Sequence, residues 1–271
     1  MMRALYTAAT GMIAQQSNVD NISNNLSNVN TVGYKEQKTE FKSLLYQTIQ
    51  TRTTSANGEK KPISAQVGLG TRVAANTSIY TQGSMIASEN STDFAISGDG
   101  FFAVRGADGE TYYTRAGNFT WAVNGNAVRL TTTDGYPVLD TNGNEITLPA
   151  GVSSGQVIVS SDGSFGYTTA KGTYVDMNRS FGIYQFNNPA GLEKEGQNLL
   201  AETPASGAPL NEATNNNVTR SKIYQNYLEG SNVQVADEMV NLIVAQRAYQ
   251  LNSKAITASD EMLEQANNLR R

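Results

Sequence analysis

The sequence predicts an α+β fold in which long helices at the two chain ends pair as a coiled coil, with an antiparallel β domain inserted between them. Apolar residues recur at heptad spacing near both ends of the 271-residue chain, and the middle combines short β-favouring runs with Asn-Gly and Asp-Gly turns. The expected domains are a helical domain of residues 1–35 and 228–271, extended connections at 36–92 and 187–227, and a β domain at 93–186.

The N-terminal helix is predicted from two interleaved sets of residues, each spaced by seven. One set is Leu5, Met12, Val19 and Leu26, and the other is Ala8, Gln15, Ile22 and Val29. Together they form an a/d seam that is sustained for about four heptads. Gly11 lies beside this seam, where a helical glycine costs about 1 kcal/mol relative to alanine. We therefore expect another helix to pack closely against it.

Asparagines form a second stripe on the same helix, at about 100° per residue. The stripe consists of Asn21, Asn24, Asn25 and Asn28. We interpret it as an amide face for neighbouring copies of the chain, and a solvated face is the alternative. Gly33 is expected to end the helix as a C-cap with positive φ.

The C-terminal helix is predicted by the same spacing. Val235, Leu242, Tyr249, Ile256 and Leu263 recur every seven residues, and Met239 and Gln246 follow the first two by four. Ser231 or Asn232 is expected to cap its start, Asp237 and Glu238 suit its first turns, and it should run to about Leu269. Gln15 and Gln246 are candidates for fixing the register of the seams through buried amides.

The partner of these seams is left open by the sequence, because periodicity predicts which face is buried and not what covers it. One interpretation is a helical hairpin inside a monomer. The other is a layer of helices contributed by several chains.

The middle of the chain is predicted to form short antiparallel strands. Runs such as "FFAV", "TYYT" and "FTWAV" alternate with turn signals such as "GDG", "NGN" and "DG", which supply the positive φ angles of tight hairpins. Segments 55–70 and 204–217 are rich in Ser, Thr, Asn, Gly and Pro, and they are expected to be flexible excursions.

Composition excludes several classes of function. Without cysteine or histidine, the chain has no Cys- or His-based zinc site and no Ser-His or Cys-His catalytic pair. A formal net charge of -4, with no basic run, argues against a nucleic-acid partner. No apolar run reaches the roughly 20 residues of a transmembrane helix. The N-terminus lacks the continuous apolar stretch of a cleavable signal peptide.

Enzymatic activity is not expected, and neither is a cofactor or metal site. The sequence contains neither a phosphate-binding loop nor a GxSxG motif. A carboxylate pair could hydrolyse a glycan, but the candidate carboxylates mostly flank glycines in turns, where they have an ordinary structural role. These candidates are Asp93, Asp99, Asp108, Asp134 and Glu145.

The motifs at both chain ends resemble those of bacterial flagellar axial proteins, the family of rod and hook subunits. One motif is "NNLSNVNTVGYK", and the other is "GSNVQVADEMVNLIVAQRAYQLNSKAITASDEML". "DFAISGDGFFAV" and "YTRAGNF" are similar to the β-domain motifs of the family. The motif residues singled out are Asn25, Asn28, Asn30, Thr31, Gly33, Tyr34, Lys35, Ser231, Asn232, Gln246, Arg247, Tyr249, Asn252 and Lys254.

The resemblance implies a structural protein, most similar to the distal rod subunits, that self-assembles into a helical tube and transmits torque from the motor to the hook. The alternative is a proximal rod or hook paralogue of the same family, or a peptidoglycan-binding or glycan-hydrolysing protein. The implied interface between subunits uses the two seams, namely Leu5, Met12, Gln15, Val19, Ile22, Leu26, Val29, Val235, Met239, Leu242, Gln246, Tyr249, Ile256 and Leu263.

The resemblance also implies where the protein acts and what it meets there. The implied location is the periplasm-spanning rod of the basal body, reached by flagellar export without signal cleavage. The implied partners are copies of the chain, other rod and hook proteins, the surrounding ring proteins and the export apparatus.

Overall fold

The chain divides into two compact units in the computed structural model, which describes residues 2–50, 65–125, 127–149, 151–169, 173–215 and 218–269. Unit 1 comprises Met1–Ser27, Gln37–Ser78 and Gln234–Arg271, and unit 2 comprises Asn28–Glu36 and Ile79–Val233. The α+β class is as predicted, with two long helices and many antiparallel strands. Of the flexible excursion expected at 55–70, residues 55–64 lie outside the described residues.

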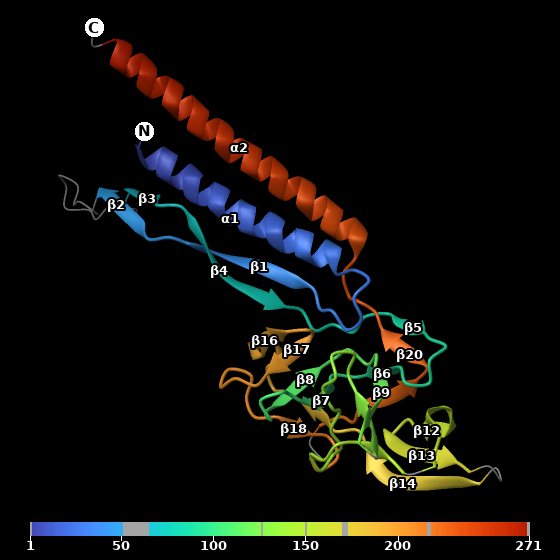
Figure 1. Cartoon of the computed structure of the whole chain (residues 1–271). Coiled ribbons are helices and arrows are strands. Elements are labelled where there is room, and N and C mark those ends of the chain that lie inside the picture. Colours follow the sequence, from blue (N-terminus) through green and yellow to red (C-terminus); the bar gives the residue numbers. More distant parts are fainter. Residues whose placement is uncertain are drawn as a thin grey trace. The chain divides into compact units, whose positions relative to one another are not determined.

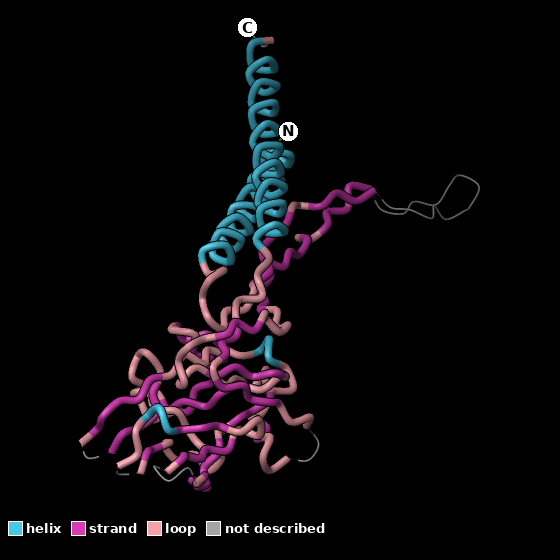
Figure 2. Tube along the Cα trace, turned by 90° about the vertical axis from the view of Figure 1, so that its right-hand side faces the viewer, coloured by secondary structure: helices cyan, strands magenta, loops and turns pink. Residues whose placement is uncertain are grey.

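Two antiparallel helices form the main part of unit 1 (Figures 1 and 2). Helix α1 spans Met2–Ser27 and helix α2 spans Val235–Asn268, so α2 has 34 residues against 26 in α1. Asn25 near the end of α1 lies beside Glu238 near the start of α2. A Cβ added to Gly11 would lie 2.9 Å from Asn252 Nδ2. The close helix approach expected at Gly11 is therefore present.

Both expected helix caps need correction. α1 ends at Ser27, six residues before Gly33, because the chain turns at residues 28–33. α2 begins at Val235 with Gln234 at its N-cap position, although Asp237 and Glu238 do occupy its first turn. Ser231 and Asn232 lie ahead of the helix and bond to loop backbone instead.

A two-stranded ribbon packs against α1 in unit 1. Strands β1 (Gln37–Ser43) and β4 (Thr71–Ser78) pair antiparallel with one irregularity after Glu40. The ribbon contacts α1 through polar side chains: Asn21 Nδ2 donates to Thr39 Oγ1 at 2.8 Å. Strands β2 (Tyr46–Gln50) and β3 (Ala65–Gly68) form a second hairpin in the same unit.

Unit 2 is built from antiparallel sheets. The largest has six strands in the order β16-β17-β8-β7-β15-β18. Their bounds are Glu193–Gly196, Leu199–Ala201, Thr111–Thr114, Phe101–Arg105, Ile183–Gln185 and Leu210–Asn211. Segment 187–227, expected as a connection, thus contributes three strands to this sheet. The predicted domain boundary at 186 stays a prediction.

Smaller sheets and short helical turns complete unit 2. One three-stranded sheet has the order β11-β10-β9, and another has the order β12-β13-β14, while β6 pairs with β19 and β5 pairs with β20. In sequence order these strands are β5 (Met85–Ala87), β6 (Phe94–Ser97), β9 (Thr120–Asn124), β10 (Ala127–Thr131), β11 (Thr147–Leu148), β12 (Val157–Val159), β13 (Ser164–Thr168), β14 (Tyr174–Ser180), β19 (Lys222–Gln225) and β20 (Tyr227–Glu229), with 3₁₀ turns η1 (Ser154–Gln156) and η2 (Pro189–Gly191).

The core of unit 2 is a cluster of aromatic rings. The Phe181 ring centroid lies 5.0 Å from that of Phe94 and 4.6 Å from that of Phe165, and Phe102 lies 5.1 Å from Phe119. The turn signals that separate the strands behave as predicted. The glycines after Asp134, Asn142 and Asp162 all have positive φ, which is the conformation that tight turns require.

Candidate functional site

A buried cluster of three charges lies where the two end motifs meet in unit 2. Glu229 Oε1 is 2.7 Å from Lys35 Nζ, and Glu229 Oε2 is 2.6 Å from Arg115 Nε. The Glu229 side chain is fully buried, and the other two are 5% exposed. Lys35 comes from the N-terminal motif, Arg115 from "YTRAGNF", and Glu229 from the end of β20.

The remaining donors of this cluster are satisfied by backbone groups. Lys35 Nζ donates to Thr81 O at 2.7 Å, and the Arg115 guanidinium donates to the carbonyls of Gly98 and Gly100. Glu229 Oε1 also accepts from the Gly83 amide at 3.0 Å. A buried charge of this kind is tolerated only when it is paired and hydrogen-bonded. The cluster therefore joins five separate segments of unit 2.

Burial and charge pull the pKa values of the cluster in opposite directions. Burial would raise the pKa of Glu229, but the charges of Arg115 and Lys35 and their hydrogen bonds lower it below its ordinary value of 4.5. Burial lowers the pKa of Lys35, and attraction to Glu229 offsets only part of this effect. The carboxylate of Glu229 is therefore held ionised in the folded chain.

Gly33 and Asn232 connect the same two motifs through backbone hydrogen bonds. The Gly33 amide donates to Glu229 O at 2.8 Å. A Cβ at this position would lie 2.6 Å from the Ala116 nitrogen, and φ is +69°. Asn232 Oδ1 accepts from the Glu36 amide at 2.7 Å, and its Nδ2 donates to Ile79 O at 2.8 Å. Both residues are thus required by close packing between distant segments of chain.

Helix α2 presents two different faces in unit 1. The face toward α1 carries small or polar buried side chains, namely Glu238, Ala245 and Ser259. Large apolar residues lie outside this stripe, spread over the rest of the helix surface at about 100° per residue, and we call them the outer face of α2. Six of them are 50% to 66% exposed: Met239, Val240, Ile243, Val244, Leu251 and Met262.

The predicted interface residues differ in how far they are buried within the chain. Ile22 is buried against the rest of unit 1. Nine are half-buried: Leu5, Met12, Gln15, Val19, Leu26, Val29, Leu242, Ile256 and Leu263. Four are exposed: Val235, Met239, Gln246 and Tyr249. No hydrogen bond joins the side chains of Gln15 and Gln246 to other described residues, so their role in fixing register stays a prediction.

The asparagine stripe of α1 is used partly inside the chain. Asn25 Nδ2 donates to Gln37 O at 2.8 Å, and its Oδ1 accepts from the Gln37 amide at 3.0 Å. Asn21 bonds to Thr39, as described above. These two side chains therefore hold the β1–β4 ribbon on α1, which corrects their assignment to a face for neighbouring chains.

Other motif residues shape the turn after α1 or remain on the surface. The Thr31 hydroxyl donates to Asn28 Oδ1 at 3.1 Å, while Asn30 is exposed and Tyr34 is half-buried. On α2, Arg247 and Lys254 are exposed. Arg247 Nη1 donates to Gln250 Oε1 at 3.2 Å.

Arg115 and Glu229 are the functional residues that sequence reasoning missed. Arg115 lies inside a quoted motif, and Glu229 directly precedes Gly230. Neither has a periodicity that marks it as buried, because both lie at the ends of short strands. Their pairing depends on contacts between residues 114 positions apart.

Three of the five carboxylates considered for catalysis form hydrogen bonds or an ion pair with neighbouring side chains. Asp108 accepts from Tyr112 Oη at 2.8 Å, and Asp93 accepts from Asn90 Nδ2 at 3.3 Å. Glu145 pairs with Arg129 at 2.9 Å. Within the described ranges, no three acidic side chains are grouped to hold a metal ion. Neither described helix has the length and apolar character needed to cross a bilayer.

Comparison with known proteins identifies the family. Residues 5–35 match "Flagella basal body rod protein", residues 95–167 match "Flagellar hook protein FlgE/F/G D1 domain", and residues 224–269 match "Flagellar basal body rod FlgEFG protein C-terminal". The flagellar basal-body rod protein FlgG of Agrobacterium fabrum is 43% identical over 96% of this chain and 97% of its own length. The chain belongs to the flagellar basal-body rod protein family.

Two further members of the flagellar basal-body rod protein family align over their full lengths. FlgG of Borreliella burgdorferi is 43% identical and FlgG of Bacillus subtilis is 38% identical, each over 100% of both chains. Membership makes this chain a structural rod protein of the flagellar basal body and not an enzyme, as the resemblance implied. Family members assemble with one another and with other rod and hook proteins.

Proposed function

We propose that the chain is a distal rod subunit and that copies of it assemble into a helical tube that transmits torque from the motor to the hook. Relatives named as the rod protein FlgG support this assignment along the whole chain. The observation that carries the proposal is the apolar outer face of α2. The six side chains of this face are at least half exposed, so an intramolecular hairpin leaves them in water.

The outer face suits contact between copies for a physical reason. Monomeric soluble proteins rarely expose so many large apolar side chains on one element. Burying a valine, leucine, isoleucine or methionine side chain contributes about 1.5–3 kcal/mol, and the six residues here are already partly covered. Their burial against another helix would therefore contribute several kcal/mol. Met239 belongs to both the outer face and the predicted seam of α2, whereas the other five residues of the outer face lie outside the predicted seams.

The proposed contact also explains why assembly would give a filament. In the proposed contact, the outer face of α2 meets a different surface of the next copy. A head-to-tail contact that does not close generates a helical filament. Leu5, Met12 and Val19, which remain half-buried on α1, are the proposed complementary surface.

The proposed setting includes the partners implied by the family. The rod would span the periplasm, contact the surrounding ring proteins and reach its place through the flagellar export apparatus. Residues 2–27 form the helix that packs on α2. Export without cleavage of this segment would preserve the helix pair.

The experiment compares one substitution on the outer face with the same substitution elsewhere. Val244→Asp places a charge on the outer face, where Val244 is 62% exposed, and Val123→Asp makes the same change in unit 2, where Val123 is 75% exposed. Both monomers should stay folded. Because an unpaired charge is costly to bury, Val244→Asp should raise the protein concentration needed for polymer formation at least about tenfold.

Sedimentation of polymers from purified full-length chain provides the measurement, and negative-stain images check their form. The Val123→Asp variant should assemble at nearly the unsubstituted concentration. Equal assembly by Val244→Asp and Val123→Asp would show that the outer face of α2 is not the contact between copies.

A further inference from the structure

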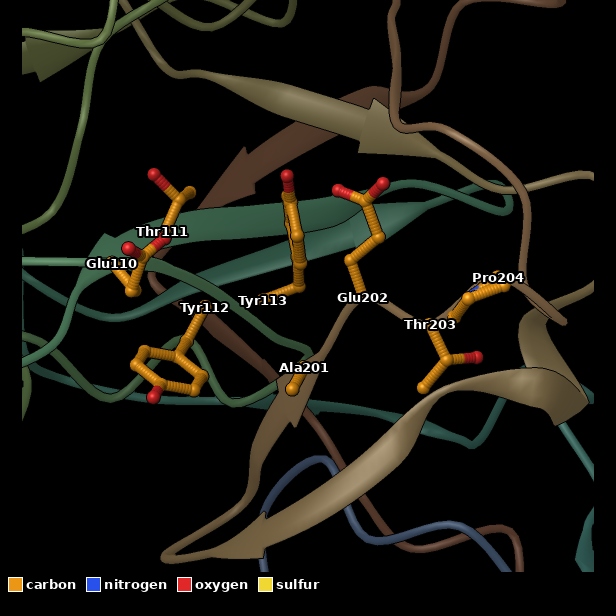
Figure 3. A pocket seen from close by; sticks show the side chains of 8 residues that line it. All are labelled: Glu110, Thr111, Tyr112, Tyr113, Ala201, Glu202, Thr203 and Pro204. Carbon is orange, nitrogen blue, oxygen red and sulfur yellow. The ribbon is translucent and has the colours of Figure 1, made fainter.

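Unit 2 contains an open cleft of about 600 Å³ on one face of its six-stranded sheet. Residues 110–113 line one side, and residues 201–204, at the end of β17, line the other (Figure 3). Tyr113 and Leu200 are cross-strand partners, and Glu202 follows Leu200 by two positions. Because strand side chains alternate between faces, Tyr113 and Glu202 extend in the same direction, as Figure 3 shows.

The Tyr113 hydroxyl opens into this cleft without a partner. Tyr113 is only 3% exposed, and its ring packs 4.8 Å from that of Phe186 and 5.5 Å from that of Tyr184. No hydrogen bond joins its hydroxyl to any described residue. The ring of Tyr113 is packed while its hydroxyl lies at the cleft, so this hydroxyl is the polar atom of Tyr113 that a ligand in the cleft can reach.

The charge of the cleft selects a cationic ligand. Glu110 and Glu202 line it, and both are exposed and make no salt bridge among the described residues. Burial and the nearby Glu202 charge raise the pKa of Tyr113, so its hydroxyl stays neutral. A neutral hydroxyl accepts a hydrogen bond from an ammonium or guanidinium group, while the two carboxylates balance the charge.

A basic surface with positive charges unpaired among the described residues lies on the β1–β4 ribbon of unit 1. Lys42 and Arg72 are directly opposite each other in the antiparallel pairing. Both are exposed, and neither forms a salt bridge within the described ranges. Like charges in directly opposite positions destabilise a strand pair, and an approaching carboxylate cluster would relieve this repulsion.

The overall charges of the two units show the same complementarity. Unit 2 contains 16 Asp and Glu against nine Lys and Arg, whereas unit 1 contains 11 Lys and Arg against eight Asp and Glu. Copies of one chain can therefore attract each other when unit 1 of one meets unit 2 of the next. This is a heterologous contact, the kind that extends a filament.

We propose that Lys42 and Arg72 on the β1–β4 ribbon of one copy dock into the acidic Tyr113 cleft of a second copy. The proposal rests on the proposed self-assembly and adds a second contact to that of α2. The α2 contact is apolar and the cleft contact is ionic, so the cleft contact sets the relative register of neighbouring copies and weakens as salt is raised.

Disulfide trapping tests whether the two surfaces meet. The chain has no cysteine, so Ser43→Cys, beside Lys42, and Pro204→Cys, beside Glu202, each introduce a single thiol and leave the charges in place. The two full-length variants are mixed, assembled and oxidised. We expect a disulfide-linked heterodimer in the polymer. The matched control mixes Ser43→Cys with Thr133→Cys, since Thr133 is exposed elsewhere in unit 2. This mixture should give little disulfide-linked heterodimer.

The outcomes separate this proposal from the proposed function. Polymers that form without trapping above the control would overturn the docking and leave self-assembly intact. Failure of every mixture to polymerise would overturn both. Peptidoglycan fragments that shield the Pro204→Cys thiol in the unassembled chain would assign the cleft to a glycan, which also overturns the docking.

Charge exchange tests the chemistry of the contact. Glu202→Lys and Lys42→Glu should each raise the concentration needed for assembly about fivefold, the factor expected from an ion pair near the upper end of the surface range. The variant that carries both changes should assemble more readily than either single variant, because the pair is restored with its signs reversed. Additive losses in the double variant would refute a direct contact between these two side chains.

Discussion

Replacement of Glu229 by glutamine tests the buried charge cluster with almost no change in shape. Glu229→Gln removes the negative charge that lies 2.7 Å from Lys35 Nζ and 2.6 Å from Arg115 Nε. The two cations then remain buried with one neutral amide between them. The glutamine NH₂ group must also face at least one of these donors, because only one of its two terminal atoms is an acceptor.

The expected loss of stability follows from the burial of all three groups. Removing one partner of a buried ion pair typically costs 3–5 kcal/mol, because the remaining charge is left uncompensated. The matched control is Glu145→Gln, which breaks the 2.9 Å pair with Arg129 in the same unit. That pair is about 30% exposed, and exposed pairs contribute only about 0–1 kcal/mol.

Urea unfolding of the full-length chain measures both variants. Trp121 is the single tryptophan and packs against the core of unit 2, so its fluorescence reports the unfolding of this unit. With a slope of about 2–3 kcal/mol per molar urea, Glu229→Gln should lower the midpoint by at least about 1 M and Glu145→Gln by less than about 0.5 M. Equal midpoint shifts would refute the claim that the cluster holds unit 2 together.

Two further predictions concern the same region. The pKa of Glu229 is lowered in the folded chain, so the stability that its charge contributes is present above pH 4.5 and is lost as pH falls through the lowered pKa. Across this range, the urea midpoint should fall more steeply for the unsubstituted chain than for Glu229→Gln. Parallel curves would contradict the lowered pKa. Gly33→Ala should lower the free energy of unfolding of unit 2 by roughly 2 kcal/mol more than Gly143→Ala does in the same urea assay. Both glycines have positive φ, but of the two only a Cβ at Gly33 meets backbone atoms. Equal losses would show that backbone strain alone matters.

Local features of the fold could be predicted from the sequence because they depend on neighbouring residues. Heptad spacing identified both helices, and Asp-Gly and Asn-Gly pairs identified turns where the structure has glycines with positive φ. Helix ends were less accurate. The capping residues Ser231 and Asn232 fit the local pattern, but Asn232 bonds to the Glu36 amide and to Ile79 O instead.

The faces of the helices were only partly predictable. The heptad pattern places Leu242 and Ile256 correctly toward partial burial, but it also selected Met239 and Tyr249, which are exposed in the chain. A helix with apolar residues on two sides gives one combined periodicity, and that periodicity does not separate an intramolecular face from an outer one.

The candidate site in unit 2 could not have been found by pattern alone. Lys35 and Glu229 are 194 positions apart and Arg115 comes from a third segment. Gly33 was assigned to a helix end, because a left-handed glycine after an apolar stripe is a common C-cap. In the structure its lack of a side chain serves the close approach to Ala116.

Methionine oxidation tests the central claim, that the outer face of α2 joins copies of the chain, most directly. Met239 and Met262 lie on that face and are at least half exposed, whereas Met177 packs against the core of unit 2. Dilute peroxide converts accessible methionine to its sulfoxide, and mass spectrometry of monomer and polymer gives the rate at each site. We predict that Met239 and Met262 react at least about tenfold more slowly in the polymer, with Met177 unchanged. Oxidation of Met239 and Met262 at the monomer rate in well-formed polymers would contradict the claim.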